Sequence, residues 1–302
     1  MNPQKIVVIG STNTDMVVRS KRLPVPGETI LGGAFMMNQG GKGANQAVAV
    51  ARMNGDVTFI AKTGDDVFGQ KTVEIFKREN IKTDYIFKEF LSPSGVAIIM
   101  VDARGENTIV VASGANSTLS TKNIDEAKDV IEKADILLMQ LEIPTQTVEY
   151  AAEMASKKGV KVILNPAPAT FLSDDLMRCL YAIIPNECEA EILSGIEVTD
   201  WESAKMAADV ISSKGVGIVV ITLGSKGTFI KDNEKYYEIP VRKIEAVDTT
   251  AAGDTFCGAF CVGLSEGLSI EEAAIMANKA AGVTVTREGA QTAIPYRYEI
   301  CF

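Results

Sequence analysis

Short apolar segments recur along the chain, and amphipathic stretches separate them. Residues 6–9 are all apolar and run directly into a glycine, which is typical of a strand buried on both faces. From about residue 121 such runs alternate regularly with segments of helical periodicity. This alternation predicts an α/β fold, in which a mostly parallel sheet is flanked by helices on both faces. The expected strands are residues 6–10, 57–60, 136–140, 160–164, 182–184, 218–222, 227–231 and 236–241, and the expected helices are residues 67–80, 145–158, 187–193, 202–214 and 270–284.

Two segments depart from this alternation. Residues 16–37 show no long helical pattern and are interrupted by prolines and glycines, so they are predicted to form short strands. Residues 95–101 and 107–111 are largely apolar and flank a glycine-containing turn, which predicts a hairpin. We expect these strands to build a small β-sheet lid at the edge of the core. Its expected bounds are about 13–38 and 93–112.

Length and charge limit the possible functions. The chain has 302 residues without a repeat or linker, so we expect residues 1–302 to form a single domain with its lid. The net charge of −9 makes nucleic acid an unfavourable partner. No apolar run reaches the ~20 residues that span a bilayer, so no membrane association is expected. The first residues lead directly into a strand and do not resemble a signal peptide, and we therefore expect a cytoplasmic protein.

The absence of histidine excludes whole classes of site. No Ser-His-Asp or Cys-His relay and no His-ligated zinc is possible, so a general base must be Asp, Glu, Lys, Tyr or Cys. The five cysteines are odd in number and form no C-x-x-C pair. Cys257 and Cys261 lie one helical turn apart and are expected to be small core residues.

Polar and glycine-rich residues follow the first strand. Residues 11–15 are a polar cluster at the carboxyl end of a strand, where open α/β sheets bind ligands. The later segment NQGGKGANQA, from Asn38 to Ala47, opens a helix with glycines that let a ligand approach the backbone, and it carries Lys42 and Asn45. It is neither a Walker A loop nor a G-x-G-x-x-G fingerprint. Taken alone, a plain glycine-rich helix start explains it equally well.

A second motif, DTTAAGDTF, covers residues 248–256 and precedes an apolar helix that extends to about Ser265. Small residues keep this helix start accessible, and its free N–H groups and dipole suit an anion such as phosphate. Asp254 lies in the first turn, where it can accept a proton from an attacking hydroxyl. The alternative is that Asp254 only complements the helix dipole.

Polar residues also follow several of the later expected strands. Each of them alone is a common turn or cap residue, but their repeated position at strand carboxyl ends indicates one shared ligand-binding edge. They are Glu142, Asn165, Asn186 with Glu189, and Thr222 with Gly224, Ser225 and Gly227.

Together, the motifs at residues 38–47 and 248–256 resemble the PfkB, or ribokinase-like, carbohydrate kinase family. The resemblance extends over the whole chain, from Ile6 to the REGAQ segment at residues 287–291. It implies a Rossmann-like core with a β-sheet lid, ATP-dependent phosphorylation of a sugar hydroxymethyl group, and a homodimer joined through the lids. The chemistry agrees with the residues, because phosphoryl transfer needs positioning, charge neutralisation and a base, but no histidine.

The resemblance also implies roles for individual residues. Asp254 matches the catalytic base, and the backbone of Ala251, Ala252 and Gly253 matches the anion hole. The residues that match sugar-binding positions are Asn13, Asp15, Gly41, Lys42, Asn45 and Glu142, together with Asp254. Those that match ATP- and Mg²⁺-handling positions are Asn186, Glu189, Thr222, Gly224, Ser225, Gly227, Gly253 and Asn278. Those that match a K⁺-type monovalent-cation site are Asp248, Thr250, Thr284, Arg287, Gly289 and Ala293.

Three functions stay open on the sequence. The first is phosphorylation of D-ribose at O5 to ribose 5-phosphate, because the resemblance places Asn13 near the sugar 2-hydroxyl, where asparagine suits ribose. The second is a kinase for another sugar or a nucleoside, such as 2-deoxyribose or fructose. The third is a catalytically silent sugar-binding regulator on the same fold.

Overall fold

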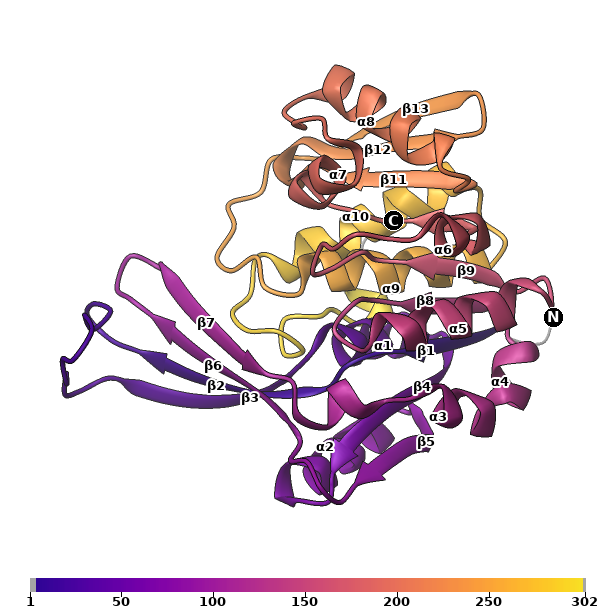
Figure 1. Ribbon diagram of the computed structural model, residues 1–302. Helices are drawn as coiled ribbons and strands as arrows, with labels where there is room; N and C mark the ends of the chain where they lie inside the picture. The colour runs from indigo at the N-terminus through magenta and orange to yellow at the C-terminus, as the bar shows by residue number, and fades with distance from the viewer. Residues whose placement is uncertain (1–3, 301–302) are drawn as a thin grey trace.

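The computed structural model describes residues 4–300 of the chain. The first three residues, which belong to the start that does not resemble a signal peptide, and Cys301 lie outside the described residues. Within these residues, a nine-stranded central sheet has the order β13-β12-β11-β10-β9-β8-β1-β4-β5 (Figure 1). All neighbours pair in parallel except β11–β12 and β12–β13. The strands are β1 (Lys5–Ile9), β4 (Asp56–Gly64), β5 (Lys82–Glu89), β8 (Ile136–Met139), β9 (Lys161–Leu164), β10 (Ala182–Ile183), β11 (Ile218–Thr222), β12 (Gly227–Asp232) and β13 (Lys235–Pro240).

Helices cover both faces of this sheet, so the predicted α/β fold is confirmed. The helices are α1 (Lys42–Arg52), α2 (Val67–Arg78), α3 (Thr121–Glu126), α4 (Lys128–Glu132), α5 (Thr145–Ser156), α6 (Asp174–Cys179), α7 (Glu187–Ser194), α8 (Trp201–Ser213), α9 (Ala252–Ser265) and α10 (Ile270–Thr284). The sequence pattern missed the short helices α3, α4 and α6. It also missed β5, an edge strand whose sequence KTDYIFKE is only partly buried and has an apolar run of just three residues, YIF.

The order of the strands creates a switch point beside β1. From β1 the chain first builds β4 and β5 on one side, and later builds β8 to β11 on the other. The loops after β1 and β8 therefore diverge and leave a crevice at the carboxyl ends of these two strands. Such a crevice is the usual ligand site of an open α/β sheet.

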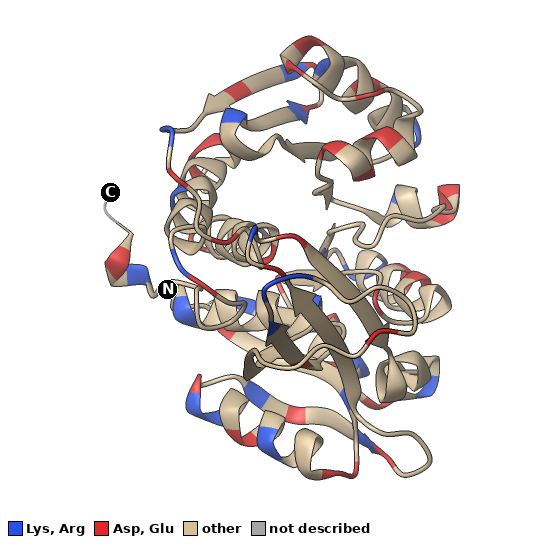
Figure 2. Ribbon diagram, turned by 90° about the vertical axis from the view of Figure 1, so that its left-hand side faces the viewer, with Lys and Arg blue, Asp and Glu red and all other residues tan. Residues whose placement is uncertain are grey.

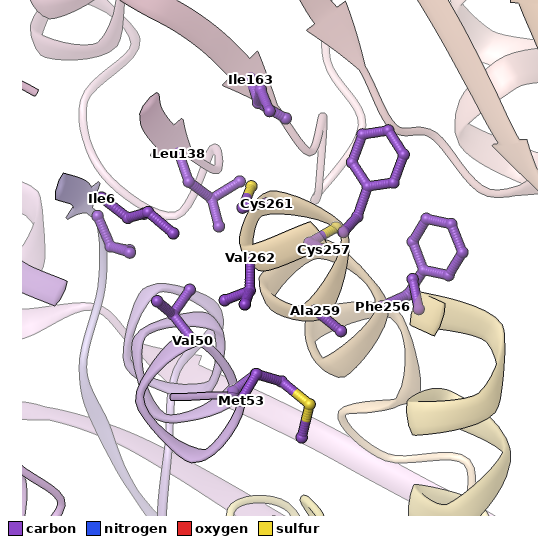
Figure 3. Packing of buried hydrophobic residues seen from close by; sticks show 14 of the residues in the cluster. Ile6, Val50, Met53, Leu138, Ile163, Phe256, Cys257, Ala259, Cys261 and Val262 are labelled. Carbon is purple, nitrogen blue, oxygen red and sulfur yellow. The ribbon is translucent and has the colours of Figure 1, made fainter. Parts of the chain in front are cut away.

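Two hydrophobic clusters fill the space between the sheet and its helices. Alternate residues of β1 point to opposite faces: Ile6 and Val8 join the cluster under α1, α9 and α10, whereas Val7 and Ile9 join the cluster under α5 to α8. In the first cluster, α9 packs beside α1, and side chains of both helices meet strand residues such as Ile6 and Leu138 (Figure 3). Cys257 and Cys261 of α9 are buried in it, as predicted.

A separate four-stranded sheet projects from one side of the core (Figure 1). We call it the small sheet; its order is β3-β2-β6-β7, with β2 (Asn13–Arg19), β3 (Ala34–Gly40), β6 (Gly95–Val101) and β7 (Asn107–Ala112). Alternation and register divide its side chains between two faces. The outer face is largely apolar and carries Met16, Val18, Phe35, Met37, Ile98, Met100 and Val110.

Basic and acidic residues are interspersed over the helices (Figure 2). None of the helices described between residues 4 and 300 is long and apolar enough to cross a membrane.

Candidate active site

A cavity of about 380 Å³ lies at the switch point, between the carboxyl ends of the central strands, the small sheet and the start of α9. Every residue that was expected at the sugar lines it: Asn13, Asp15, Gly41, Lys42, Asn45, Glu142 and Asp254. The small sheet adds apolar wall from its inner face, namely Ala97, Ile99, Ile109 and Val111.

The start of α1 lies against the end of β1. A Cβ on Gly43 would lie 2.6 Å from the Gly10 backbone, so the close approach of these two segments requires glycine. The Ser11 hydroxyl and the Lys42 N–H both donate to Glu142 Oε2, at 2.6 and 3.0 Å. Because Glu142 follows β8, these bonds join the two sides of the switch point.

Only the first two residues of the polar cluster at residues 11–15 lie in the loop after β1. Asn13 and Asp15 instead begin β2, which pairs with β3 and β6 of the small sheet. Since they are two positions apart on a strand, their side chains share the face that lines the cavity.

The amino terminus of α9 presents unpaired backbone donors. Ala251 precedes the helix in the left-handed conformation with φ 61°, and its carbonyl accepts from Thr255 N–H at 2.8 Å. The N–H of Ala252 bonds to a loop carbonyl, whereas those of Gly253 and Asp254 have no acceptor within residues 4–300. Two free N–H groups at the positive end of a 14-residue helix are suited to hold an anion.

The carboxylate of Asp254 is held by two amides from α1. Asn45 Nδ2 donates to Asp254 Oδ2 at 2.9 Å, and Gln46 Nε2 donates to Asp254 Oδ1 at 3.0 Å. Asp254 is 7% exposed and lines the cavity. The first sequence motif therefore orients the carboxylate of the second, in a position where it can take a proton from a hydroxyl in the cavity.

The residues expected at the nucleotide fall into two groups. Asn186 and Glu189 form a capping box at the start of α7, with reciprocal bonds of 2.8 and 2.9 Å. Asn186 also forms a β-bridge with Thr222. The first group therefore consists of Asn186, Glu189 and Thr222, which line the cavity together with Gly253. The others are not among the lining residues and lie before and in β12 and on α10: Gly224, Ser225, Gly227 and Asn278. In the described chain, Asn278 Nδ2 is buried without a hydrogen-bond partner.

The residues expected at a monovalent cation gather around Asp248. Its Oδ1 accepts from the Thr250 N–H and hydroxyl, at 2.9 and 2.6 Å, and its Oδ2 accepts from Gly289 N–H at 3.0 Å. Burial acts to raise the pKa of Asp248, but these hydrogen bonds outweigh it and lower the pKa. The remaining expected residues lie on α10 and the segment after it: Thr284, Arg287 and Ala293. No group of three or more acidic or cysteine side chains that could hold a metal ion occurs among residues 4–300.

Comparison with known proteins identifies the family of this fold and site. Residues 3–297 match the model of the pfkB family of carbohydrate kinases. The chain belongs to this family. It is 47% identical over 294 residues to a ribokinase of Haemophilus influenzae, which covers 97% of this chain and 96% of the relative. It is 37% identical to a deoxyribokinase of Salmonella typhi, over 96% of this chain and 95% of the relative. The solved structure of Arabidopsis thaliana ribokinase complexed with ribose and ATP has a TM-score of 0.91, with 33% identity over 99% and 98% of the two chains.

Several charged groups of this carbohydrate kinase share the cavity. Burial, reinforced by the negative charges of Glu142 and Asp254, raises the pKa of Asp15 to about 7. Burial is also the main cause that raises the pKa of Asp254 and of Glu189. For Lys42, burial favours the neutral amine, but the charges of Asp254, Glu142 and Glu189 outweigh it and raise the pKa. The site therefore combines a protonated lysine with carboxylates that bind protons more tightly than exposed ones.

A buried amide network supports Asp254, and sequence reasoning missed most of it. Gln46 Nε2 also donates to Asn165 Oδ1 at 3.1 Å, and Gln46 Oε1 accepts from Gln140 Nε2 at 2.5 Å. Asn165 Nδ2 in turn donates to the Ile184 carbonyl at 2.9 Å. One available signal was Gln140, a polar residue at the end of the apolar run ILLMQ, because a polar side chain inside a buried strand needs a hydrogen-bond partner.

Proposed function

We propose that this carbohydrate kinase transfers the γ-phosphoryl group of ATP to O5 of D-ribose, giving D-ribose 5-phosphate and ADP. The observation that carries the proposal is the position of Asp254, a buried carboxylate beside the free N–H groups of α9 in a cavity lined by sugar-compatible polar groups. The names of the similar proteins, ribokinases at up to 47% identity and one complexed with ribose and ATP, support the same substrates.

In this mechanism Asp254 takes the proton of the O5 hydroxyl while that oxygen attacks the γ-phosphorus, and the bond from phosphorus to the ADP oxygen breaks. The amides of Asn45 and Gln46 hold the carboxylate toward the hydroxyl. The free N–H groups of Gly253 and Asp254 bind the charged oxygens of the transferred group, as in an oxyanion hole. The raised pKa of Asp254 makes it a stronger base than an exposed aspartate.

The sugar is held by groups that match hydroxyls in both hydrogen-bond directions. Asp15 accepts from two neighbouring hydroxyls, and Asn13 and Asn45 add further partners. A site of this kind disfavours a sugar that lacks one hydroxyl, because a buried polar group then stays unpaired. On the nucleotide side we assign Asn186, Glu189 and Thr222 to the phosphates. We assign the remaining expected residues to the rest of ATP, namely Gly224, Ser225, Gly227 and Asn278.

Two cations complete the proposal. Mg²⁺ neutralises the ATP phosphates and typically needs only one or two protein carboxylates, so the absence of an acidic cluster within residues 4–300 does not conflict with it. For a monovalent cation such as K⁺ we assign the site around Asp248, whose lowered pKa keeps its carboxylate ionised. Its effect there is to order the loop that leads into α9.

We also propose that the small sheet is a lid over the sugar and that two molecules associate through their lids. The outer face supports this, because Phe35, Ile98 and Val110 are 62%, 45% and 64% exposed, and an exposed apolar face of this kind usually marks an interface. Since the reaction consumes ATP, we propose the cytoplasm as its compartment.

A coupled assay of ADP release across a panel of sugars tests this function. D-ribose is expected to exceed 2-deoxyribose by roughly tenfold or more in kcat/KM, because the deoxy sugar leaves a polar group unpaired. Asn13→Met should narrow this gap, mainly by weakening ribose. Equal kcat/KM for the two sugars, or a preference for 2-deoxyribose, would overturn the ribose assignment. Sugar binding without any turnover would instead favour the silent regulator.

A further inference from the structure

The side chain of Asn116 is docked on the backbone beside the sugar site. Asn116 lies in a 3₁₀ turn at Gly114–Thr118 and is 1% exposed. Its Oδ1 accepts from Thr12 N–H at 2.9 Å, and its Nδ2 donates to the Thr12 carbonyl at 3.1 Å. A backbone N–H can only donate and a carbonyl can only accept, so this two-point contact fixes which way the Asn116 amide points.

The same Nδ2 makes a second bond, which fixes the neighbouring amide. Asn116 Nδ2 donates to Asn13 Oδ1 at 2.8 Å. Asn13 Oδ1 is therefore turned to Asn116, and within residues 4–300 Asn13 Nδ2 donates to no protein atom. Since Asn13 is 5% exposed and lines the cavity, its NH₂ group is the polar group left to face a ligand.

We propose that Asn116 is a positioning residue that sets the hydrogen-bond polarity of Asn13 and thereby the preference for a sugar with a hydroxyl at that position. The proposal rests on the proposed function, in which Asn13 contacts the sugar. With its NH₂ group inward, Asn13 donates to the hydroxyl oxygen while Asp15 accepts the hydroxyl proton. With the amide reversed, Asn13 and Asp15 would both be acceptors and would compete for a single proton.

Gly95 leaves room for the contact between the Asn13 and Asn116 amides. It lies opposite Asn13 in the parallel pairing of β2 with β6. A Cβ at Gly95 would lie 2.2 Å from Asn13 Oδ1 and 2.3 Å from Asn116 Nδ2. Glycine therefore leaves the space in which the two amides meet, and Gly95→Ala breaks their contact without adding a charge.

The main test is Asn116→Asp. The new carboxylate still accepts from Thr12 N–H but has no hydrogen to donate, so the Asn13 amide turns to donate to it. We expect kcat/KM for D-ribose to fall roughly tenfold or more, mostly through ribose KM, and the ratio of ribose to 2-deoxyribose to fall toward one. The KM for ATP should not change. Calorimetric titration with ribose should show the same loss in the absence of ATP.

Asn123→Asp provides the matched control. Asn123 is a buried amide that caps α3 through a bond from Ser120 N–H at 3.1 Å and does not line the cavity. The same chemical change there should leave the sugar ratio unaltered. Gly95→Ala is the second probe; it should lower the ratio as Asn116→Asp does, and it keeps the inference testable if Asn116→Asp fails to fold.

A double-mutant cycle separates positioning from a general structural effect. In an Asn13→Met background there is no amide to orient, so Asn116→Asp should leave the sugar ratio as it is in the single Asn13→Met variant. If Asn116→Asp instead lowers activity on both sugars by one common factor in either background, the inference is wrong. Failure of the unmodified enzyme to use ribose at all would refute the proposed function, whereas an unchanged ratio in Asn116→Asp and Gly95→Ala would refute this inference alone.

Discussion

Replacement of Asp254 by asparagine separates its chemical role from its structural one. The carboxylate accepts from Asn45 and Gln46, whereas an amide has only one oxygen. Gln46 cannot turn, because Gln140 and Asn165 hold both ends of its amide. Asn45 can, since its Oδ1 is buried and has no partner among the described residues. After Asn45 reverses, the new amide accepts from Gln46 and donates to Asn45 Oδ1, so both contacts with α1 are kept. The Asn45 NH₂ group then takes the buried position in which its oxygen had no partner.

The main expected loss is in the chemical step. General-base assistance contributes about 10²–10⁴ in rate, which corresponds to roughly 3–5 kcal/mol of activation free energy. We expect Asp254→Asn to lower kcat by that factor and to leave KM for ATP within a few-fold.

Stability should change with pH in a defined direction. Because burial raises the pKa of Asp254 in the folded state, this group stabilises the fold below its unfolded pKa and loses that contribution as pH rises through the folded pKa. Asparagine does not titrate. Relative to the unmodified enzyme, Asp254→Asn should gain stability as pH rises above about 4, the unfolded pKa of aspartate.

The assay pairs single-turnover ADP formation with urea unfolding at several pH values. Asp200→Asn is the control, because it makes the same change at the start of α8, where Asp200 caps Ser203 N–H at 2.8 Å and does not line the cavity. It should retain full kcat. If Asp254→Asn keeps the kcat of the unmodified enzyme, Asp254 is not the base and only complements the dipole of α9.

Four further predictions follow from individual contacts. The kcat/KM for ribose should rise as pH increases through about 7, the pKa of Asp15, because only the ionised carboxylate can accept from two hydroxyls. Asp15→Asn should remove this rise, and a kcat/KM of the unmodified enzyme that does not change with pH would contradict the role of Asp15. Gln46→Met removes a donor to Asp254 and should raise its pKa further, so the acid limb of kcat should move to higher pH, and an unmoved limb would refute the support role. Activity should be higher with K⁺ than with tetramethylammonium at matched ionic strength, and Asp248→Asn should abolish the difference; equal rates with both ions would exclude a cation-ordered loop. Light scattering at micromolar concentration should give the molar mass of a dimer for the unmodified enzyme and that of a monomer for Ile98→Glu, because Ile98 lies on the exposed apolar outer face. A monomeric mass for the unmodified enzyme would exclude association through the lids.

The sequence by itself determined the layered α/β fold and the two motifs that meet in the cavity. Both can be recognised from local sequence patterns. A strand buried on both faces consists of a run of apolar residues, and a helix start that binds an anion is preceded by small residues. The sequence did not reveal β5, because an edge strand is only half covered and keeps its charged residues.

The tertiary structure alone decided which polar groups face one another. Gln46 and Gln140 lie 94 positions apart, and Asn13 and Asn116 lie 103 apart, yet each pair shares a buried hydrogen bond. No local pattern records such pairs, because they form only when the loops after β1 and β8 diverge and the small sheet folds over the gap. The raised pKa of Asp15 has the same origin: burial and the charges of Glu142 and Asp254 act on it only after distant segments meet.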